Sequence, residues 1–318
     1  MQPEDFAPYV ATLGRGPGKS RALTRAEARD AFGLVLAGAV DPHQLGAFLM
    51  LLRYRGEDAD EIAGIVEAMQ APLPPCPQAD LDWPSYGAGK TRDLPWFLLA
   101  ALALGRSGIR VLMHGTNAFG TAVPVAAGLG FLGLAPARDG DDAAALLDRT
   151  GFAYLPIETL APGVAHLLDL RRLFGLRSPV NTAVRLLDPA RAPAGVDGVF
   201  HPAYLDVHLG VAERLGRPRL VVLKGGGGEA ERVPAKPGVA HVWDSGTGRG
   251  TIDLPARPIG GDGAGLEPAA LFRRVWEGDL PEAGGVAAVQ ATISLALLAL
   301  GRADADADAV RIWNARMG

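Results

Sequence analysis

Apolar residues in the first seventy positions recur at helical spacing, and each predicted helix begins at a polar start signal. Residues 24–27 (Thr-Arg-Ala-Glu) form a capping box, in which the hydroxyl and the carboxylate each accept a backbone amide, and the helix should reach about Ala37. Asp41-Pro42 predicts a second helix, because proline loses no hydrogen bond at the first helical position. A third helix begins near Asp58 or Asp60. The apolar positions behind the last two signals are Leu45, Phe48, Leu49, Leu52, Ile62, Ile65, Val66 and Met69.

The pattern changes after the third helix. Residues 71–84 contain five prolines and no apolar periodicity, which predicts that the helical unit ends in an extended linker. Two short β-rich runs follow, at residues 109–113 and 219–223, and each leads into a glycine-containing turn. Helix-like apolar segments occupy residues 95–104, 204–215, 286–300 and 305–317.

Helices that alternate with short buried strands predict an α/β fold with a central, mostly parallel or mixed sheet flanked by helices. We therefore expect a small all-helical domain at residues 1–72 and a larger α/β domain at residues 79–318. In such sheets, ligands bind at the carboxyl ends of the strands, where the glycine-containing turns lie.

Composition excludes several classes of protein. Of 318 residues, 48% are hydrophobic, so the chain can bury a large core although it contains 42 glycines and 25 prolines. The longest apolar stretch, residues 286–300, is shorter than the ~20 residues of a membrane span. The N-terminus lacks the pattern of a secretory signal, and Cys76 is the one cysteine, which excludes a disulfide framework within one chain. We expect a soluble, cytoplasmic protein without a membrane segment.

A glycine-rich turn at residues 87–91 (Gly-Ala-Gly-Lys-Thr) is similar to the tail of a nucleotide-binding P-loop. The glycine that a P-loop needs five residues before its Gly-Lys pair is replaced by Pro84, and residues 80–83 are not the apolar strand that a P-loop leaves. We therefore do not predict an NTPase. The turn can still hold an anion through Gly87, Gly89, Lys90 and Thr91, or it can be a plain turn with a solvated lysine; both interpretations stay open.

Two further turns follow the predicted strands. His114 comes directly after the first and can act as an acid, a base or a hydrogen-bond donor, but a lone histidine at a strand end is also commonly structural. Residues 225–228 are four consecutive glycines, which permit close approach of a ligand or form a flexible loop. Glu229 and Glu231 are the carboxylates nearest to this loop.

Arginines cluster at one place in the chain. The net charge is −4, yet residues 171–191 contain five arginines and one acid. On a helix, the adjacent Arg171 and Arg172 point about 100° apart, so one can face a cleft and the other solvent. These cations either neutralise a helix C-terminus before Gly175 or bind an anion. The arginines are Arg171, Arg172, Arg177, Arg185 and Arg191.

The order of these segments resembles the anthranilate phosphoribosyltransferase family, which belongs to glycosyltransferase family 3 and shares its fold with pyrimidine nucleoside phosphorylases. The family's GTGGD turn, which holds the pyrophosphate of phosphoribosyl pyrophosphate, corresponds to residues 87–91, and its KHGNR motif to residues 113–117. The arginine that contacts anthranilate corresponds to Arg171. The resemblance implies phosphate or ligand binding by Gly87, Gly89, Lys90, Thr91, His114, Gly115, Asn117 and Arg171. It also implies a homodimer formed through the helical domain.

The chain departs from the family motifs at charged positions. The turn has lost its acid, the KHGNR motif has lost both cations, and the family's Asp-Glu magnesium pair falls on Ala230-Glu231. Departure of pyrophosphate depends on Mg²⁺ and on neutralising cations, and Lys90 cannot replace a metal-binding carboxylate. We expect a degenerate phosphoribosyl pyrophosphate site and no anthranilate phosphoribosyltransferase activity. Only Glu231 is left as a candidate magnesium ligand, so no cofactor is assigned and binding of Mg²⁺ stays open.

Two functions therefore remain open. One is phosphoribosyl or pentosyl transfer to an unidentified acceptor, with a phosphorylated small molecule as the partner. The other follows from the resemblance to a branch of the family that lacks the enzymatic activity and binds nucleic acid. In that case Arg171, Arg172, Arg177 and Arg185 would bind the phosphates of single-stranded DNA or RNA along a groove. The acidic total charge weakens this second interpretation.

Overall fold

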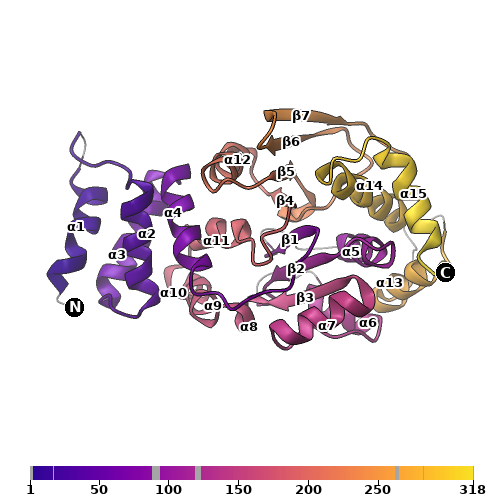
Figure 1. The fold of residues 1–318 in the computed structure, drawn as a ribbon, viewed down its shortest axis with the longest axis horizontal. Coiled ribbons are helices and arrows are strands. Elements are labelled where there is room, and N and C mark those ends of the chain that lie inside the picture. Colours follow the sequence, from indigo (N-terminus) through magenta and orange to yellow (C-terminus); the bar gives the residue numbers. More distant parts are fainter. Residues whose placement is uncertain are drawn as a thin grey trace.

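The computed structural model describes residues 3–16, 18–87, 94–118, 123–261, 265–281 and 283–317. A helical bundle forms one end of the elongated molecule, and the α/β domain forms the rest (Figure 1). The bundle contains α1 (Pro3–Gly14), α2 (Arg25–Leu36), α3 (Pro42–Arg55) and α4 (Ala59–Gln70).

Local capping explains where these helices begin. The Thr24 hydroxyl accepts the Glu27 amide at 3.2 Å, and the Glu27 carboxylate accepts the Thr24 amide at 2.9 Å, which confirms the capping box of α2. The Asp41 carboxylate accepts the amide of His43 at the start of α3. Asp58 caps α4 in the same way. The three predicted helices are confirmed, and α1 adds a fourth.

Seven strands form one mixed sheet in the order β3-β2-β1-β4-β5-β6-β7. Strands β1 to β5 pair in parallel, and β6 and β7 extend the sheet as an antiparallel hairpin. This is the mixed sheet that the sequence predicts. The strands are β1 (Leu81–Ser85), β2 (Val111–Gly115), β3 (Phe152–Pro156), β4 (Ala194–Val199), β5 (Arg219–Lys224), β6 (Gly238–Asp244) and β7 (Gly248–Leu254).

The prediction that residues 71–84 are a linker is wrong at its C-terminal end. Residues 81–85 form β1, a fully buried central strand. The charge of Asp82 hides this strand in the sequence, and the Arg217 guanidinium neutralises it at 2.9 Å. Pro84 is tolerated because β1 pairs with β4 only at Leu81 and Asp82, so the missing amide of Pro84 costs no bond on that side. A buried strand therefore does precede Gly87, although the charged residues of this segment do not read as an apolar strand in the sequence.

Helices cover both faces of the sheet and divide the apolar core into two parts. Residues of α5 (Trp96–Arg106), α14 (Gly284–Ala299) and α15 (Ala305–Ala315) pack in one part. Residues of the bundle, α7 (Gly140–Thr150) and α12 (Leu205–Arg214) pack in the other. The remaining helices are α6 (Val125–Phe131), α8 (Ile157–Leu160), α9 (Pro162–Asp169), α10 (Arg171–Phe174), α11 (Val180–Ala183) and α13 (Pro268–Glu277). Among the described helices, none has the length and apolar composition needed to cross a bilayer.

Candidate functional site

The turn after β1 begins at Gly87, whose backbone adopts a positive φ of 53°. The Gly87 amide donates a hydrogen bond to the Glu229 carboxylate at 2.5 Å. Glu229 thereby joins the glycine loop after β5 to the turn after β1. Gly89, Lys90 and Thr91, which the sequence proposes as anion ligands, lie outside the described residues.

The four glycines at residues 225–228 build a compact loop. Gly227 and Gly228 have positive φ values of 65° and 83°. A Cβ atom on Gly225 would lie 1.6 Å from the Glu229 carbonyl oxygen, so no larger residue fits there. Close packing of the loop on itself explains these glycines, and the flexible-loop interpretation has no support in this geometry.

The family's magnesium pair falls on two residues that do not suit a metal ion. The Glu231 carboxylate accepts the Phe97 amide at 2.9 Å, at the beginning of α5. Ala230 is fully buried and offers only a methyl group. Within the described ranges, no group of three or more His, Cys, Asp or Glu side chains could hold a metal ion. Because Glu231 accepts a backbone amide and Ala230 carries no side-chain oxygen, this pair does not fit Mg²⁺, and we derive no step through it.

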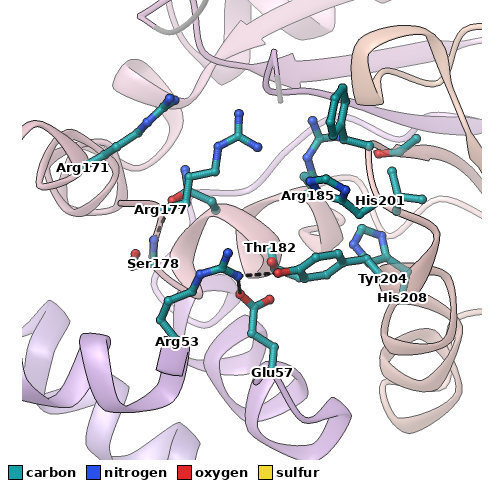
Figure 2. Close-up of a pocket in the computed structure, with 14 residues that line it drawn as sticks. Arg53, Glu57, Arg171, Arg177, Ser178, Thr182, Arg185, His201, Tyr204 and His208 are labelled. Atoms are coloured by element: carbon teal, nitrogen blue, oxygen red, sulfur yellow. Dashed lines mark hydrogen bonds and ion pairs between the residues drawn. The ribbon is translucent and has the colours of Figure 1, made fainter. Parts of the chain in front are cut away.

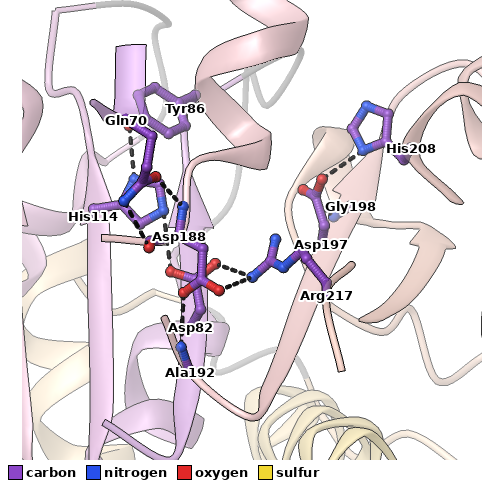
Figure 3. A network of polar contacts seen from close by, with 10 residues as sticks. All are labelled: Gln70, Asp82, Tyr86, His114, Asp188, Ala192, Asp197, Gly198, His208 and Arg217. Atoms are coloured by element: carbon purple, nitrogen blue, oxygen red, sulfur yellow. Dashed lines mark hydrogen bonds and ion pairs between the residues drawn. The ribbon is translucent and has the colours of Figure 1, made fainter. Parts of the chain in front are cut away.

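His114 lies inside the sheet, fully buried (Figure 3). Its Nδ1 accepts a hydrogen bond at 2.8 Å from the Tyr86 hydroxyl, which stays protonated because burial raises its pKa well above the ordinary value. Its Nε2 lies 3.3 Å from Asp82, which also binds Arg217. These contacts tie β1 to β2 and favour the structural interpretation of His114.

Gly115 and Asn117 also serve local packing. A Cβ atom on Gly115 would lie 1.9 Å from the Ser85 carbonyl oxygen, so β2 can approach β1 only with glycine there. The Asn117 side-chain oxygen accepts the Ala126 amide and the Tyr154 hydroxyl, each at 3.2 Å. Gly115 ends β2, and the two bonds of Asn117 connect the start of α6 to β3.

A pocket of about 310 Å³ opens between the helical bundle and the α/β domain, and we call it the arginine pocket (Figure 2). It brings together Arg171, Arg177 and Arg185 from the sequence cluster. Arg172 points elsewhere and pairs with Asp169 at 2.7 Å, as the predicted 100° separation requires. The lining residues are Arg53, Glu57, Arg171, Arg177, Ser178, Asn181, Thr182, Arg185, Gly198, Val199, Phe200, His201, Tyr204 and His208.

The pocket has an excess of positive charge. Burial, followed by repulsion from Arg171, Arg185 and Arg53, lowers the pKa of Arg177 to about 10. Glu57 is the one carboxylate among the described lining residues. It pairs with Arg53 at 3.4 Å, although burial raises the pKa of this carboxyl. An anion in the pocket would relieve the repulsion among the arginines.

Sequence reasoning missed several pocket residues. Arg53 from α3 donates a hydrogen bond to the Tyr204 hydroxyl at 2.5 Å, across 151 positions of sequence. His208 lines the pocket and contacts Asp197 at 2.6 Å. These residues belong to no sequence motif and lie at no regular spacing from one another. The sequence therefore gives no reason to place them in one pocket.

Two family models match the chain. The model described as glycosyl transferase family, helical bundle domain, matches residues 7–71. The model described as glycosyl transferase family, a/b domain, matches residues 97–315. Together they cover both domains of the fold.

The chain is similar to several anthranilate phosphoribosyltransferases. The enzyme of Beijerinckia indica is 30% identical and covers 84% of this chain and 76% of its own length. Anthranilate phosphoribosyltransferase 2 of Streptomyces coelicolor is 32% identical and covers 90% of this chain and 82% of its own. The structure of the Thermus thermophilus enzyme matches with a TM-score of 0.78 and 25% identity, over 98% of this chain and 93% of that chain.

Proposed function

Because the chain belongs to the glycosyl transferase family that joins a helical bundle to an a/b domain, we propose that it binds a small phosphate- or carboxylate-bearing ligand in its interdomain cleft. We propose further that its phosphoribosyl pyrophosphate site is degenerate, so that it is not an active anthranilate phosphoribosyltransferase. We also propose that it is a cytoplasmic protein.

The observation that supports this proposal is the hydrogen bond from the Phe97 amide to Glu231. Through this bond the one carboxylate left of the family's magnesium pair contacts the beginning of α5, and its neighbour Ala230 offers a buried methyl group. Met113, where the family motif has a cation, is fully buried in the apolar core. Pyrophosphate departure needs charges that these positions do not supply.

Arg171 supports the ligand-binding half of the proposal. It lies in a pocket with three other arginines, and guanidinium groups bind phosphate or carboxylate through paired hydrogen bonds. Binding of single-stranded nucleic acid has less support. Arg185 is only 5% exposed and contacts Asp197, while Arg172 points out of the pocket toward Asp169. The four arginines therefore do not line one open groove.

The homodimer through the helical bundle also remains a proposal. Tyr54, at the C-terminal end of α3, is 90% exposed, and Leu173 on α10 is 81% exposed. Light scattering coupled to size-exclusion chromatography should give twice the chain mass. A mass of one chain at micromolar concentration would contradict this.

Calorimetry and an enzymatic assay test the main proposal. Titration of phosphoribosyl pyrophosphate with Mg²⁺ should give no magnesium-dependent heat, and anthranilate fluorescence should not decrease when all three are mixed. The Thermus thermophilus enzyme serves as the positive control in the same buffer. Magnesium-dependent consumption of anthranilate by this chain would contradict the proposal.

A further inference from the structure

A buried carboxylate–imidazole pair lies beside the arginine pocket (Figures 2 and 3). Asp197 on β4 is completely buried, and its Oδ2 lies 2.6 Å from Nδ1 of His208 on α12. The other carboxylate oxygen accepts the Gly198 amide at 2.7 Å and lies 3.4 Å from Arg185. The carboxylate is therefore fixed, and it fixes the orientation of the imidazole ring.

The ring of His208 forms part of the pocket wall. Since Nδ1 donates to Asp197, Nε2 is the ring nitrogen left to face the pocket. With a proton on each ring nitrogen, Nδ1 donates to Asp197 and Nε2 donates to a ligand oxygen, so the ring can bridge the buried carboxylate and a bound anion.

The surrounding wall favours an anion with more than one charge. Four arginines line the pocket with one carboxylate, Glu57, and Asp197 behind the wall pairs with Arg185, which leaves a formal excess of two positive charges. Uncharged polar groups lie beside them, on Ser178, Asn181 and Thr182. A carboxylate ligand offers two oxygens and a single charge. A phosphomonoester offers three terminal oxygens and two charges, which matches donors converging from several elements.

We propose that the arginine pocket binds the dianionic phosphate of a small phosphomonoester, with His208 Nε2 as a donor to a phosphate oxygen and Asp197 as the residue that positions the ring. The site contains Arg171, which the resemblance assigns to the anthranilate contact, and none of the residues 87–91 that it assigns to the pyrophosphate. The volume of about 310 Å³ admits a small molecule and is at the low end for ligand sites. Phe200, which is partly exposed, offers an apolar wall for the organic part.

Calorimetry on the full chain without Mg²⁺ tests this site. The probes are glycerol 3-phosphate, which carries no ribose, inorganic phosphate, and glycerol as the uncharged control. The His208→Gln and Arg177→Gln variants should each weaken binding of glycerol 3-phosphate about tenfold or more. Matched controls are His43→Gln, an exposed histidine on α3, and Arg172→Gln, which is adjacent in sequence to Arg171 but outside the pocket. Both controls should bind as the parent does.

One further readout, NMR of the imidazole ring, and the second pocket variant keep the test decisive. Nitrogen-15 NMR of the His208 ring should show both nitrogens protonated when glycerol 3-phosphate is bound, a signature that a structural histidine would not give. If His208→Gln does not fold, Arg177→Gln carries the test. Equal affinity for inorganic phosphate identifies free phosphate as the ligand and still supports the site.

Three results would overturn the proposal: no binding of either phosphate, binding that both folded pocket variants retain in full, or binding of a single-stranded oligonucleotide in place of glycerol 3-phosphate. This proposal rests on the ligand-binding half of the proposed function, and the measurements separate it from the other half, the degenerate phosphoribosyl pyrophosphate site. Magnesium-dependent turnover of anthranilate with intact His208-dependent phosphate binding would reject the proposed function and leave this site standing. Absence of anthranilate turnover, combined with phosphate binding that the pocket variants retain in full, would reject this site and leave the degenerate phosphoribosyl pyrophosphate site standing.

Discussion

The carboxylate of Glu231 accepts the backbone amide of Phe97 at 2.9 Å and so joins the segment after the glycine loop to the beginning of α5. Both groups are buried, where a hydrogen bond to a charged acceptor stabilises the fold and an interrupted one is costly. We therefore expect Glu231→Ala to lower the free energy of unfolding by about 1–3 kcal/mol. Glu231→Gln, which keeps an oxygen acceptor, should cost less. Urea titrations measure both, and a Glu231→Ala variant as stable as the parent would contradict the structural role.

The buried Tyr86 hydroxyl tests the interpretation of His114. Tyr86→Phe removes the donor to Nδ1 of His114 and leaves the ring in place. We expect a loss of about 1–3 kcal/mol in the free energy of unfolding, because a buried acceptor then lacks its partner. Ligand affinity in the arginine pocket should stay unchanged. Unchanged stability combined with lost ligand binding would instead assign His114 to the binding site.

The close approach of β2 to β1 at Gly115 predicts a third effect on stability. Gly115→Ala would place a methyl group 1.9 Å from the Ser85 carbonyl oxygen, so strands β1 and β2 would have to separate. The expected loss in the free energy of unfolding is about 2 kcal/mol or more. Gly130→Ala on α6 is the matched control, since a Cβ atom there meets nothing within 4 Å and alanine favours a helix. Thermal denaturation should rank the control at or above the parent, and equal melting of both variants would refute the close approach.

Glu57 predicts a pH dependence of stability. Burial raises the pKa of this carboxyl, despite the opposing contacts with Thr182 and Arg53. An acid whose pKa is higher in the folded than in the unfolded state stabilises the fold at low pH, and the contribution is lost as the pH rises through the folded pKa. Glu57→Gln removes the carboxyl and, with it, the free energy needed to ionise a buried acid at high pH. The variant should therefore be more stable than the parent at pH 8, by a larger margin than at pH 5.

Urea titrations at the two pH values measure the difference for Glu57→Gln. Glu277→Gln, at the exposed end of α13, serves as the control and should give the same small difference at both. An equal effect of Glu57→Gln at pH 5 and pH 8 would contradict the raised pKa.

Local signals in the sequence predict the elements whose stability is local. The capping box at Thr24 and the cap at Asp41 locate α2 and α3 because each bond joins residues two or three positions apart. The apolar runs locate β2 and β5 because apolar side chains can be buried without a polar partner. β1 was not predicted because it contains a charged residue, Asp82. The partner that neutralises this charge, Arg217, lies 135 positions away in the sequence. β4 was not predicted because it contains two glycines and an aspartate.

The candidate site likewise contains some residues that the sequence predicts and others that only the fold brings together. Clustering predicted Arg171 and Arg177, which are close in sequence. Arg53, Tyr204 and His208 could not be predicted, since only the packing of the bundle against α11 and α12 brings them together. The sequence also overestimates the ligand role of residues such as His114, whose partners Tyr86 and Asp82 are visible only in the fold.

The most direct test of the central claim is isothermal titration of the full chain with phosphoribosyl pyrophosphate in the presence and absence of Mg²⁺, followed by addition of anthranilate to the same sample. The account predicts no heat that depends on magnesium and no decrease in anthranilate fluorescence, because Glu231 holds α5 and Ala230 offers no metal ligand. Magnesium-dependent binding followed by consumption of anthranilate would contradict it.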